Sequence, residues 1–151
     1  MAIEMVAGFI LDMARQNVLL IEKSRPEWQK GRVNGIGGKI KEGENRYKAM
    51  VRESEEETGL TIETFLHYAT INGSGWRVYF FVTVIEPLYL IEDTTDEGTL
   101  LIAPVRNLPE NVLYNLNWLI PLALDEDILR PSIIYDKTKY NGLEKYIIWD
   151  D

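Results

Sequence analysis

Two apolar runs near the N-terminus are separated by a short polar stretch. The runs lie within Met5–Glu22, and the polar stretch is Asp12–Asn17. Short β-rich runs joined by a polar turn predict a β-hairpin. Residues 23–44, KSRPEWQKGRVNGIGGKIKEGE, follow and are rich in charge, Gly and Pro. This composition predicts a long loop with one short extended piece, and a loop of that length in a compact domain is usually functional.

A helical pattern begins at Glu44 and continues to Thr58. Its buried stripe is predicted at the spacing i, i+3, i+4, i+7 and i+11, which selects Tyr47, Met50, Val51, Ser54 and Thr58. Gly59 follows directly and suits the residue that ends a helix in a left-handed conformation. The segment therefore predicts one amphipathic helix over residues 44–58.

The remainder of the chain alternates strand-like and helical segments. Strands are predicted at Ile62–Ile71, Arg77–Ile85 and Thr99–Val105, and a helix shortened or bent by Pro121 is predicted at Asn111–Leu124. Asn141-Gly142 predicts a C-terminal hairpin over about 132–149. Strands and helices mixed in this way predict a mixed sheet covered by helices, in a single α/β or α+β domain spanning residues 1–151.

Composition and charge exclude several classes of protein. Hydrophobic residues make up 46% of the 151 residues, enough for a core without disulfides or a structural metal. The net charge of −8 argues against a nucleic-acid polymer as partner, because binding phosphate backbones requires a basic surface. With no cysteine and only His67, the familiar zinc sites are excluded. No apolar run is long enough to span a membrane and Glu4 precedes the first one, so a cytoplasmic location is expected.

The predicted helix carries a dense group of glutamates. At 100° per residue, Glu53, Glu56 and Glu57 fall within an arc of about 100°, on the side away from the predicted buried stripe. Carboxylates converging from consecutive turns suit a hard cation such as Mg²⁺ or Mn²⁺. The alternative is a solvated acidic face, which glutamate runs usually form.

The segment from Gly38 to Leu60 favours the metal site. It has the form G-x5-E-x7-R-E-S-x-E-E-x-G-L, which closely resembles the Nudix box, GX5EX7REUXEEXGU, where U is a bulky aliphatic residue. Every fixed residue is present over residues 38–60, and Ser54 alone departs from the pattern. Ser54 lies on the predicted buried stripe, so its effect is expected on packing more than on chemistry.

The resemblance to the Nudix family implies a fold, an activity and a set of roles. Nudix enzymes hydrolyse nucleoside diphosphates linked to another moiety with a divalent metal, and their fold is an α/β/α sandwich around a mixed sheet. The family pattern implies that Glu53, Glu56 and Glu57 hold the metal, with the Gly37 carbonyl as a further ligand. It also implies that Arg52 positions these glutamates and that Glu44 is its ion-pair partner.

The general base is left between two residues. Glu97, in the acidic stretch DTTDEG, lies where MutT-like members carry a base that can also bind metal, and Glu53 is the competing candidate. The alternative for Asp93–Glu97 is a mobile acidic turn without a catalytic role.

Within the family, the resemblance is closest to MutT-type enzymes that act on oxidised purine nucleotides. It implies that Asn34, Asn115 and Asn117 contact the base, since an amide both donates and accepts hydrogen bonds. Tyr114, Trp118 and Trp28 are candidate stacking residues, with the alternative that they belong to the core or anchor a loop. Lys23, Arg25 and Lys39 are the expected contacts to the phosphates, with solvated surface charge as the alternative. Gly38 is also expected to bind the substrate.

The expected reaction converts a nucleoside triphosphate, preferably 8-oxo-dGTP, into a nucleoside monophosphate and pyrophosphate. Other Nudix substrates stay open: ADP-ribose hydrolases often carry a proline where this chain has Ser74-Gly75-Trp76, whereas Tyr79 keeps a diadenosine polyphosphate possible. A nucleotide sensor without catalysis is the alternative of another class. The partner expected in each case is a small nucleotide, bound to a monomer or a homodimer.

Overall fold

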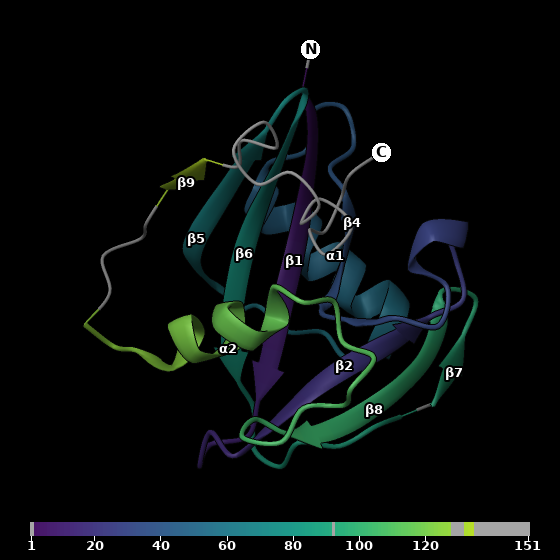
Figure 1. Cartoon of the computed structure of the whole chain (residues 1–151), viewed down its shortest axis with the longest axis vertical. Coiled ribbons are helices and arrows are strands. Elements are labelled where there is room, and N and C mark those ends of the chain that lie inside the picture. Colours follow the sequence, from purple (N-terminus) through teal and green to yellow (C-terminus); the bar gives the residue numbers. More distant parts are fainter. Residues whose placement is uncertain (1, 92, 128–131, 135–151) are drawn as a thin grey trace.

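The computed structural model describes residues 2–91, 93–127 and 132–134, whose arrangement is shown in Figure 1. In chain order the elements are β1 (Ile3–Leu11), β2 (Asn17–Lys23), the 3-10 helix η1 (Glu27–Gln29), β3 (Val33–Asn34), β4 (Ile36–Lys39), α1 (Arg46–Thr58), β5 (Leu66–Gly73), β6 (Trp76–Val84), β7 (Thr94–Thr95), β8 (Gly98–Pro104), α2 (Leu116–Leu124) and β9 (Ser132–Ile134). Apart from β9, the predicted C-terminal hairpin lies outside the described residues.

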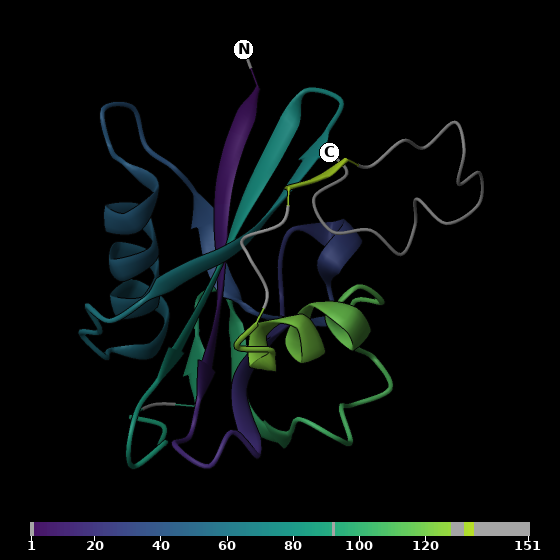
Figure 2. The same ribbon diagram turned by 90° about the vertical axis from the view of Figure 1, so that its left-hand side faces the viewer.

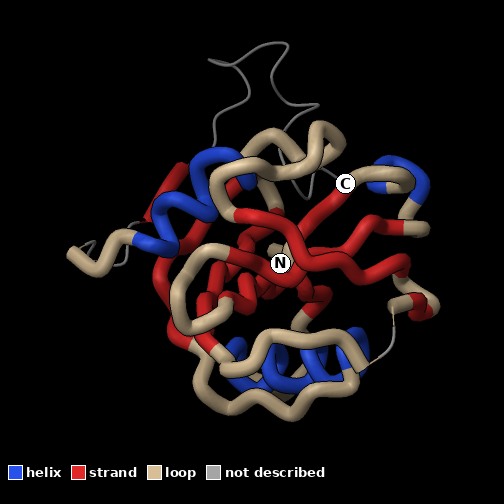
Figure 3. Tube along the Cα trace, turned by 90° about the horizontal axis from the view of Figure 1, so that it is seen from below, coloured by secondary structure: helices blue, strands red, loops and turns tan. Residues whose placement is uncertain are grey.

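A mixed β-sheet forms the middle layer of the molecule. Its strand order is β7-β8-β2-β1-β6-β5-β9, with β3 paired to β2 and β4 paired to β1. β1 runs parallel to β6 and β5 runs parallel to β9, whereas the β1–β2 and β2–β8 pairs are antiparallel. Figures 2 and 3 show α1 on one face of this sheet and α2 on the other. The predicted α/β/α sandwich is therefore confirmed.

The central strand β1 supplies both apolar cores. Phe9 packs in the core beneath α2, where Phe80 stacks with it at a ring separation of 6.4 Å. Val6 points to the opposite face and packs with Met50 of α1. Because successive side chains of a strand point to opposite faces, a strand covered on both sides is apolar at nearly every position.

Most predicted strands are present, with shifted boundaries. The predicted N-terminal hairpin is confirmed by the antiparallel pairing of Ile10 with Leu19. β5 begins four residues later than predicted, because Ile62 and Phe65 pack in the core beneath α1 before the strand starts. The segment predicted as a long loop contains η1, β3 and β4.

Helix α1 begins and ends as its terminal residues dictate. The Asn45 side chain accepts a hydrogen bond of 2.8 Å from the Lys48 amide, and Gly59 ends the helix with a φ of 76°. The predicted stripe is wrong at Tyr47, whose side chain is 40% exposed. Glu57 was expected on the outer face but is only 3% exposed, so the buried face of α1 includes a carboxylate.

Helix α2 is shorter than predicted because its predicted first turn is extended. The Val33 amide donates to the Asn111 carbonyl and the Leu113 amide donates to the Val33 carbonyl, so this segment runs alongside β3. The helix starts at Leu116 and tolerates Pro121 in its second turn. Within the described part of the chain, no helix has the length and apolar character needed to cross a bilayer.

Candidate active site

Two adjacent glycines bring strand β4 against helix α1. A Cβ atom on Gly37 would lie 1.9 Å from the Val6 carbonyl oxygen, and a Cβ atom on Gly38 would lie 2.4 Å from Oε1 of Glu53. Neither glycine has a positive φ. They are required because any side chain would occupy the space of the backbone of β1 or of the Glu53 carboxylate.

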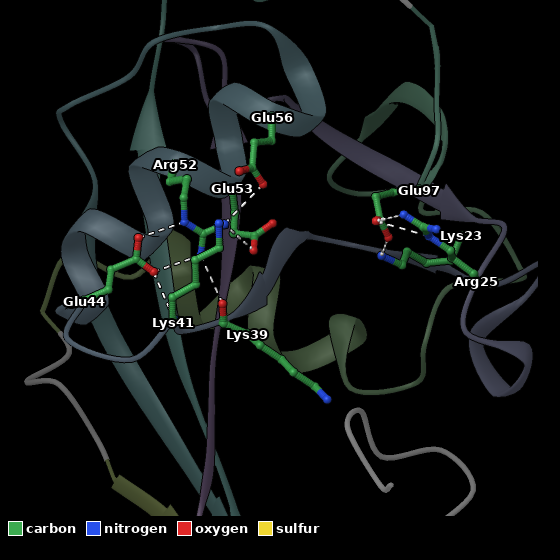
Figure 4. A network of polar contacts seen from close by, with 9 residues as sticks. All are labelled: Lys23, Arg25, Lys39, Lys41, Glu44, Arg52, Glu53, Glu56 and Glu97. Carbon is green, nitrogen blue, oxygen red and sulfur yellow. Dashed lines mark hydrogen bonds and ion pairs between the residues drawn. The ribbon is translucent and has the colours of Figure 1, made fainter.

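Arg52 holds the acidic face of α1 in a fixed arrangement (Figure 4). Its Nε donates to Oε2 of Glu44 at 2.8 Å and its Nη2 donates to Oε1 of Glu44 at 2.9 Å. Its Nη1 donates to Glu53 at 2.9 Å and to Glu56 at 3.2 Å, while Nη2 also reaches the Lys39 carbonyl at 3.1 Å. Hydrogen bonds from Arg52 lower the pKa of Glu44 to about 2, so this partner stays ionised. We call these five residues the Arg52 network.

Glu57 lies one turn after Glu53 in a very different environment. Burial raises its pKa to about 8, and the positive charge of Lys23 opposes that rise only in part. Both carboxylate oxygens are buried without a hydrogen-bond partner among the described residues. The Gly37 amide faces this carboxylate and favours its charged form, but no regular hydrogen bond closes between them. A buried, unpaired carboxylate destabilises a fold unless a cation compensates it.

Glu97 approaches the same region from the start of β8. Nε and Nη2 of Arg25 donate to its Oε1 at 3.2 and 2.6 Å, and Lys23 Nζ lies 3.5 Å from its Oε2 (Figure 4). The Arg25 hydrogen bonds hold the pKa of Glu97 below its usual range, although partial burial opposes them. Burial instead raises the pKa of Glu53, against the effect of Arg52. The two candidate bases thus differ in their tendency to be ionised.

A cleft of about 650 Å³ connects these groups. Glu53 and Glu97 line it together with Gly37, Gly38 and Lys39. Its remaining wall consists of Met5, Lys23, Arg25, Pro26, Trp28 and Gln29. Glu56 instead borders a separate hollow on the outer side of α1. The cleft therefore combines carboxylates and cations with an aromatic and an amide side chain.

The comparison with known families agrees with this geometry. A model of the NUDIX domain matches residues 3–119, which include the whole segment 38–60. The chain belongs to the Nudix family. The protein is accordingly a Nudix hydrolase, and the expectation drawn from the box is confirmed.

Solved Nudix structures share the fold of this protein. The MutT protein of Bacillus halodurans aligns with a TM-score of 0.72 at 21% identity, over 90% of this chain and 92% of that one. The NUDIX domain of Shewanella oneidensis NrtR, solved with ADP ribose, aligns with a TM-score of 0.67 at 16% identity, over 82% and 86%. An ADP-ribose pyrophosphatase from Streptococcus suis aligns with a TM-score of 0.63 at 15% identity, over 87% and 99%. At these identities the likeness establishes the fold alone.

The Nudix glutamates are divided between two environments. Across residues 2–91, 93–127 and 132–134, no three acidic or imidazole side chains are gathered into a ready-made metal cage. Glu53 and Glu56 bind Arg52, whereas the Glu57 carboxylate lies next to Gly37 and has no hydrogen-bond partner in the part of the chain that the structure describes. The buried carboxylate without a hydrogen bond and its oxygen donors fit a hard divalent cation at Glu57.

The three asparagines that were expected to contact the purine base lie in different environments. Asn34 is fully buried, does not line the cleft and hydrogen-bonds to Gln29, so it does not point into the cleft as expected. Asn115 is 2% exposed, and neither polar atom of its side chain has a partner among the described residues. Asn117 is exposed and donates to the Tyr114 carbonyl at 3.0 Å. Trp118 is 38% exposed, which excludes a fully buried core role.

Sequence reasoning missed Gln29 and Met5 as cleft residues. Gln29 follows Trp28 in the polar segment that was predicted as a loop, where no periodicity indicates burial. The 3-10 helix η1 turns it inward, and its side chain is 2% exposed. Met5 belongs to a strand with no chemical signal in its sequence.

Proposed function

We propose that this Nudix hydrolase is a MutT-like enzyme that cleaves a purine nucleoside triphosphate into a nucleoside monophosphate and pyrophosphate. The observation that carries the proposal is the unpartnered carboxylate of Glu57, one helical turn from Glu53, which binds Arg52 and lines a cleft that also holds cations and an aromatic ring. Hydrolysis of a phosphoanhydride requires charge compensation and positioning, with little covalent chemistry from the protein.

The proposed cofactor is Mg²⁺, with Mn²⁺ as the alternative. Glu53, Glu56 and Glu57 would hold it, with the Gly37 carbonyl and Glu97 as further ligands. When bound, such a cation neutralises phosphate oxygens and lowers the pKa of water. Arg52 orients Glu53 and Glu56 through its planar guanidinium, so these carboxylates need little reorganisation when the cation arrives.

The phosphates are proposed to meet a row of cations along the cleft. Lys23, Arg25 and Lys39 all line it, and the Lys39 side chain extends away from the Arg52 network in Figure 4. Lys23 is only 8% exposed, so its ammonium group acts where water screens it weakly. The Gly38 backbone completes this end of the cleft.

The purine base of the substrate is proposed to occupy the end of the cleft formed by η1. Trp28 lines the cleft and is 40% exposed, so a face of its ring is accessible for stacking. Asn115 directly precedes α2 and lies two residues after Leu113, whose amide donates to the Val33 carbonyl beside Asn34. Its unpaired amide is proposed to take part in purine recognition, with Asn117 further out on the same segment.

A substrate panel tests this proposal. Purified protein with Mg²⁺ is incubated with purine and pyrimidine triphosphates, 8-oxo-dGTP, ADP-ribose and a diadenosine polyphosphate, and kcat/KM is determined for each. We expect 8-oxo-dGTP and other purine triphosphates to lead. If ADP-ribose or the diadenosine polyphosphate far exceeds every triphosphate, the substrate class is wrong although the Nudix assignment holds. Tight nucleotide binding without turnover would identify a sensor.

The variants Glu97→Gln and Glu53→Gln test which residue is the general base of the reaction. Both variants should slow hydrolysis, but only loss of the true base removes the acidic limb of the pH–rate profile, because a base must be ionised to accept a proton. We expect Glu97→Gln to flatten that limb, since its lowered pKa keeps it ionised near neutral pH. Asp96→Asn, on the exposed neighbouring residue, is the matched control. Wild-type rates for Glu97→Gln at every pH would reduce Glu97 to a loop residue.

A further inference from the structure

A chain of two amide side chains runs from the backbone of Gly35, between β3 and β4, to the cleft. The Gly35 amide donates to Oδ1 of Asn34 at 2.7 Å, and Nδ2 of Asn34 donates to Oε1 of Gln29 at 3.2 Å. Asn34 is fully buried and Gln29 is 2% exposed, so little water competes for these bonds. Of these residues, Gln29 alone lines the cleft.

The direction of this chain is fixed by its first member. A backbone N–H can only donate, so the atom of Asn34 that faces Gly35 must be the oxygen. The NH₂ group of Asn34 then faces Gln29, which must offer its own oxygen in return. The Gln29 amide nitrogen is what remains, and it makes no hydrogen bond to another side chain or backbone group in the described part of the protein.

We propose that Gln29 is a specificity-determining residue whose side-chain NH₂ donates to the 6-oxo group of a purine base. The inference rests on the proposed function, because it assumes that the base lies at the η1 end of the cleft beside Trp28. An NH₂ group fixed in this orientation can bind guanine, because O6 of guanine accepts a hydrogen bond. It opposes adenine, whose 6-amino group is itself a donor, so that two N–H groups would face each other without a partner.

Asn34 has a different role in this arrangement. Its side chain does not reach the cleft, and it acts as a positioning residue that prevents the Gln29 amide from flipping. Without this constraint, the Gln29 side chain could present either its oxygen or its nitrogen, and the cleft would not distinguish an oxo group from an amino group.

The test is the Gln29→Glu variant. Glutamate keeps the shape and the oxygen that Asn34 requires but has no N–H to offer the base. We expect the ratio of kcat/KM for GTP over ATP to fall by about tenfold or more, as is usual when one directional hydrogen bond is lost. Gln16→Glu makes the same chemical change on the exposed β1–β2 turn and should leave the ratio unchanged.

A substrate pair tests the same contact in the wild-type protein. Guanine and 2,6-diaminopurine triphosphates share the 2-amino group and differ in the 6-oxo or 6-amino group and in the accompanying proton on N1. We expect the guanine nucleotide to be preferred by about tenfold. Equal rates for this pair, or an unchanged GTP/ATP ratio in Gln29→Glu, would overturn the role of Gln29 while leaving the proposed hydrolysis intact.

Binding of the monophosphates keeps the test independent of turnover. The Kd values of GMP and AMP are measured by calorimetry for wild type and Gln29→Glu. A preference for GMP that disappears in the variant supports the inference even if no triphosphate is hydrolysed. Hydrolysis failing in wild type would defeat the proposed function, whereas equal Kd values for GMP and AMP in wild type would defeat the role of Gln29.

Discussion

Replacing Glu57 by glutamine should abolish hydrolysis while making the metal-free protein more stable. The amide has the shape of the carboxylate but no charge for a divalent cation. Since a bound metal supplies several kcal/mol of transition-state stabilisation, we expect kcat/KM to fall by about a thousandfold or more. The measurement is pyrophosphate release from a purine triphosphate with Mg²⁺.

The stability of the metal-free wild-type protein should fall as the pH rises, and that of Glu57→Gln should lack this dependence. Burial raises the pKa of Glu57 from 4.5 to about 8, so the folded protein binds this proton more tightly than the unfolded chain. The free energy of unfolding of the metal-free wild-type protein therefore decreases as the pH rises from about 4.5 to about 8. The glutamine cannot ionise, so the Tm of Glu57→Gln in EDTA should exceed that of wild type at pH 9 by several degrees.

The matched control is Glu55→Gln, an exposed glutamate on the same helix. Its activity and its stabilisation by Mg²⁺ should remain those of wild type, whereas Glu57→Gln should no longer be stabilised by Mg²⁺. Near wild-type turnover in Glu57→Gln would show that its carboxylate does not hold the metal.

The Arg52→Ala variant should be the second most damaging change. Arg52 binds Glu44, Glu53 and Glu56 at once, and its removal leaves Glu53, which is 14% exposed at its side chain, without a cation. We expect kcat/KM to fall by about a hundredfold, because a misplacement of about 1 Å at a catalytic group has an effect of that size. The free energy of unfolding should fall by about 2 kcal/mol.

Arg52→Lys distinguishes positioning from charge alone. A lysine keeps the charge but cannot form the two parallel bonds to Glu44 and reach Glu53 at the same time. We expect it to restore part of the stability and little of the activity. Lys48→Ala, which removes an exposed cation from the same helix, should change neither. Full activity in Arg52→Lys would mean that the fork geometry of Arg52 is not needed.

Local signals in the sequence were sufficient for the helix that carries the site. Gly59 ends α1 as predicted because a left-handed residue is required there, and the Arg52–Glu44 ion pair implied by the resemblance is present. The same periodicity was wrong about Tyr47 and Glu57. Burial on α1 depends on strands β1 and β4 packed against it, and helical spacing alone carries no information about those partners.

The cleft itself could be predicted less well. Gln29 and Asn34 are 5 residues apart, and which of them faces the substrate is decided by the inward turn of η1. Glu97 meets Arg25 across 72 residues, because β8 pairs with β2. Contacts of this kind arise from sheet order, which strand propensities do not determine.

The most direct test of the account combines metal dependence with product identity. Wild-type protein is incubated with dGTP, and the products are identified by phosphorus NMR with Mg²⁺ and after addition of EDTA. The proposed function predicts dGMP and pyrophosphate in equal amounts with Mg²⁺ and no products in EDTA. Release of inorganic phosphate and dGDP, or undiminished turnover in EDTA, would contradict it.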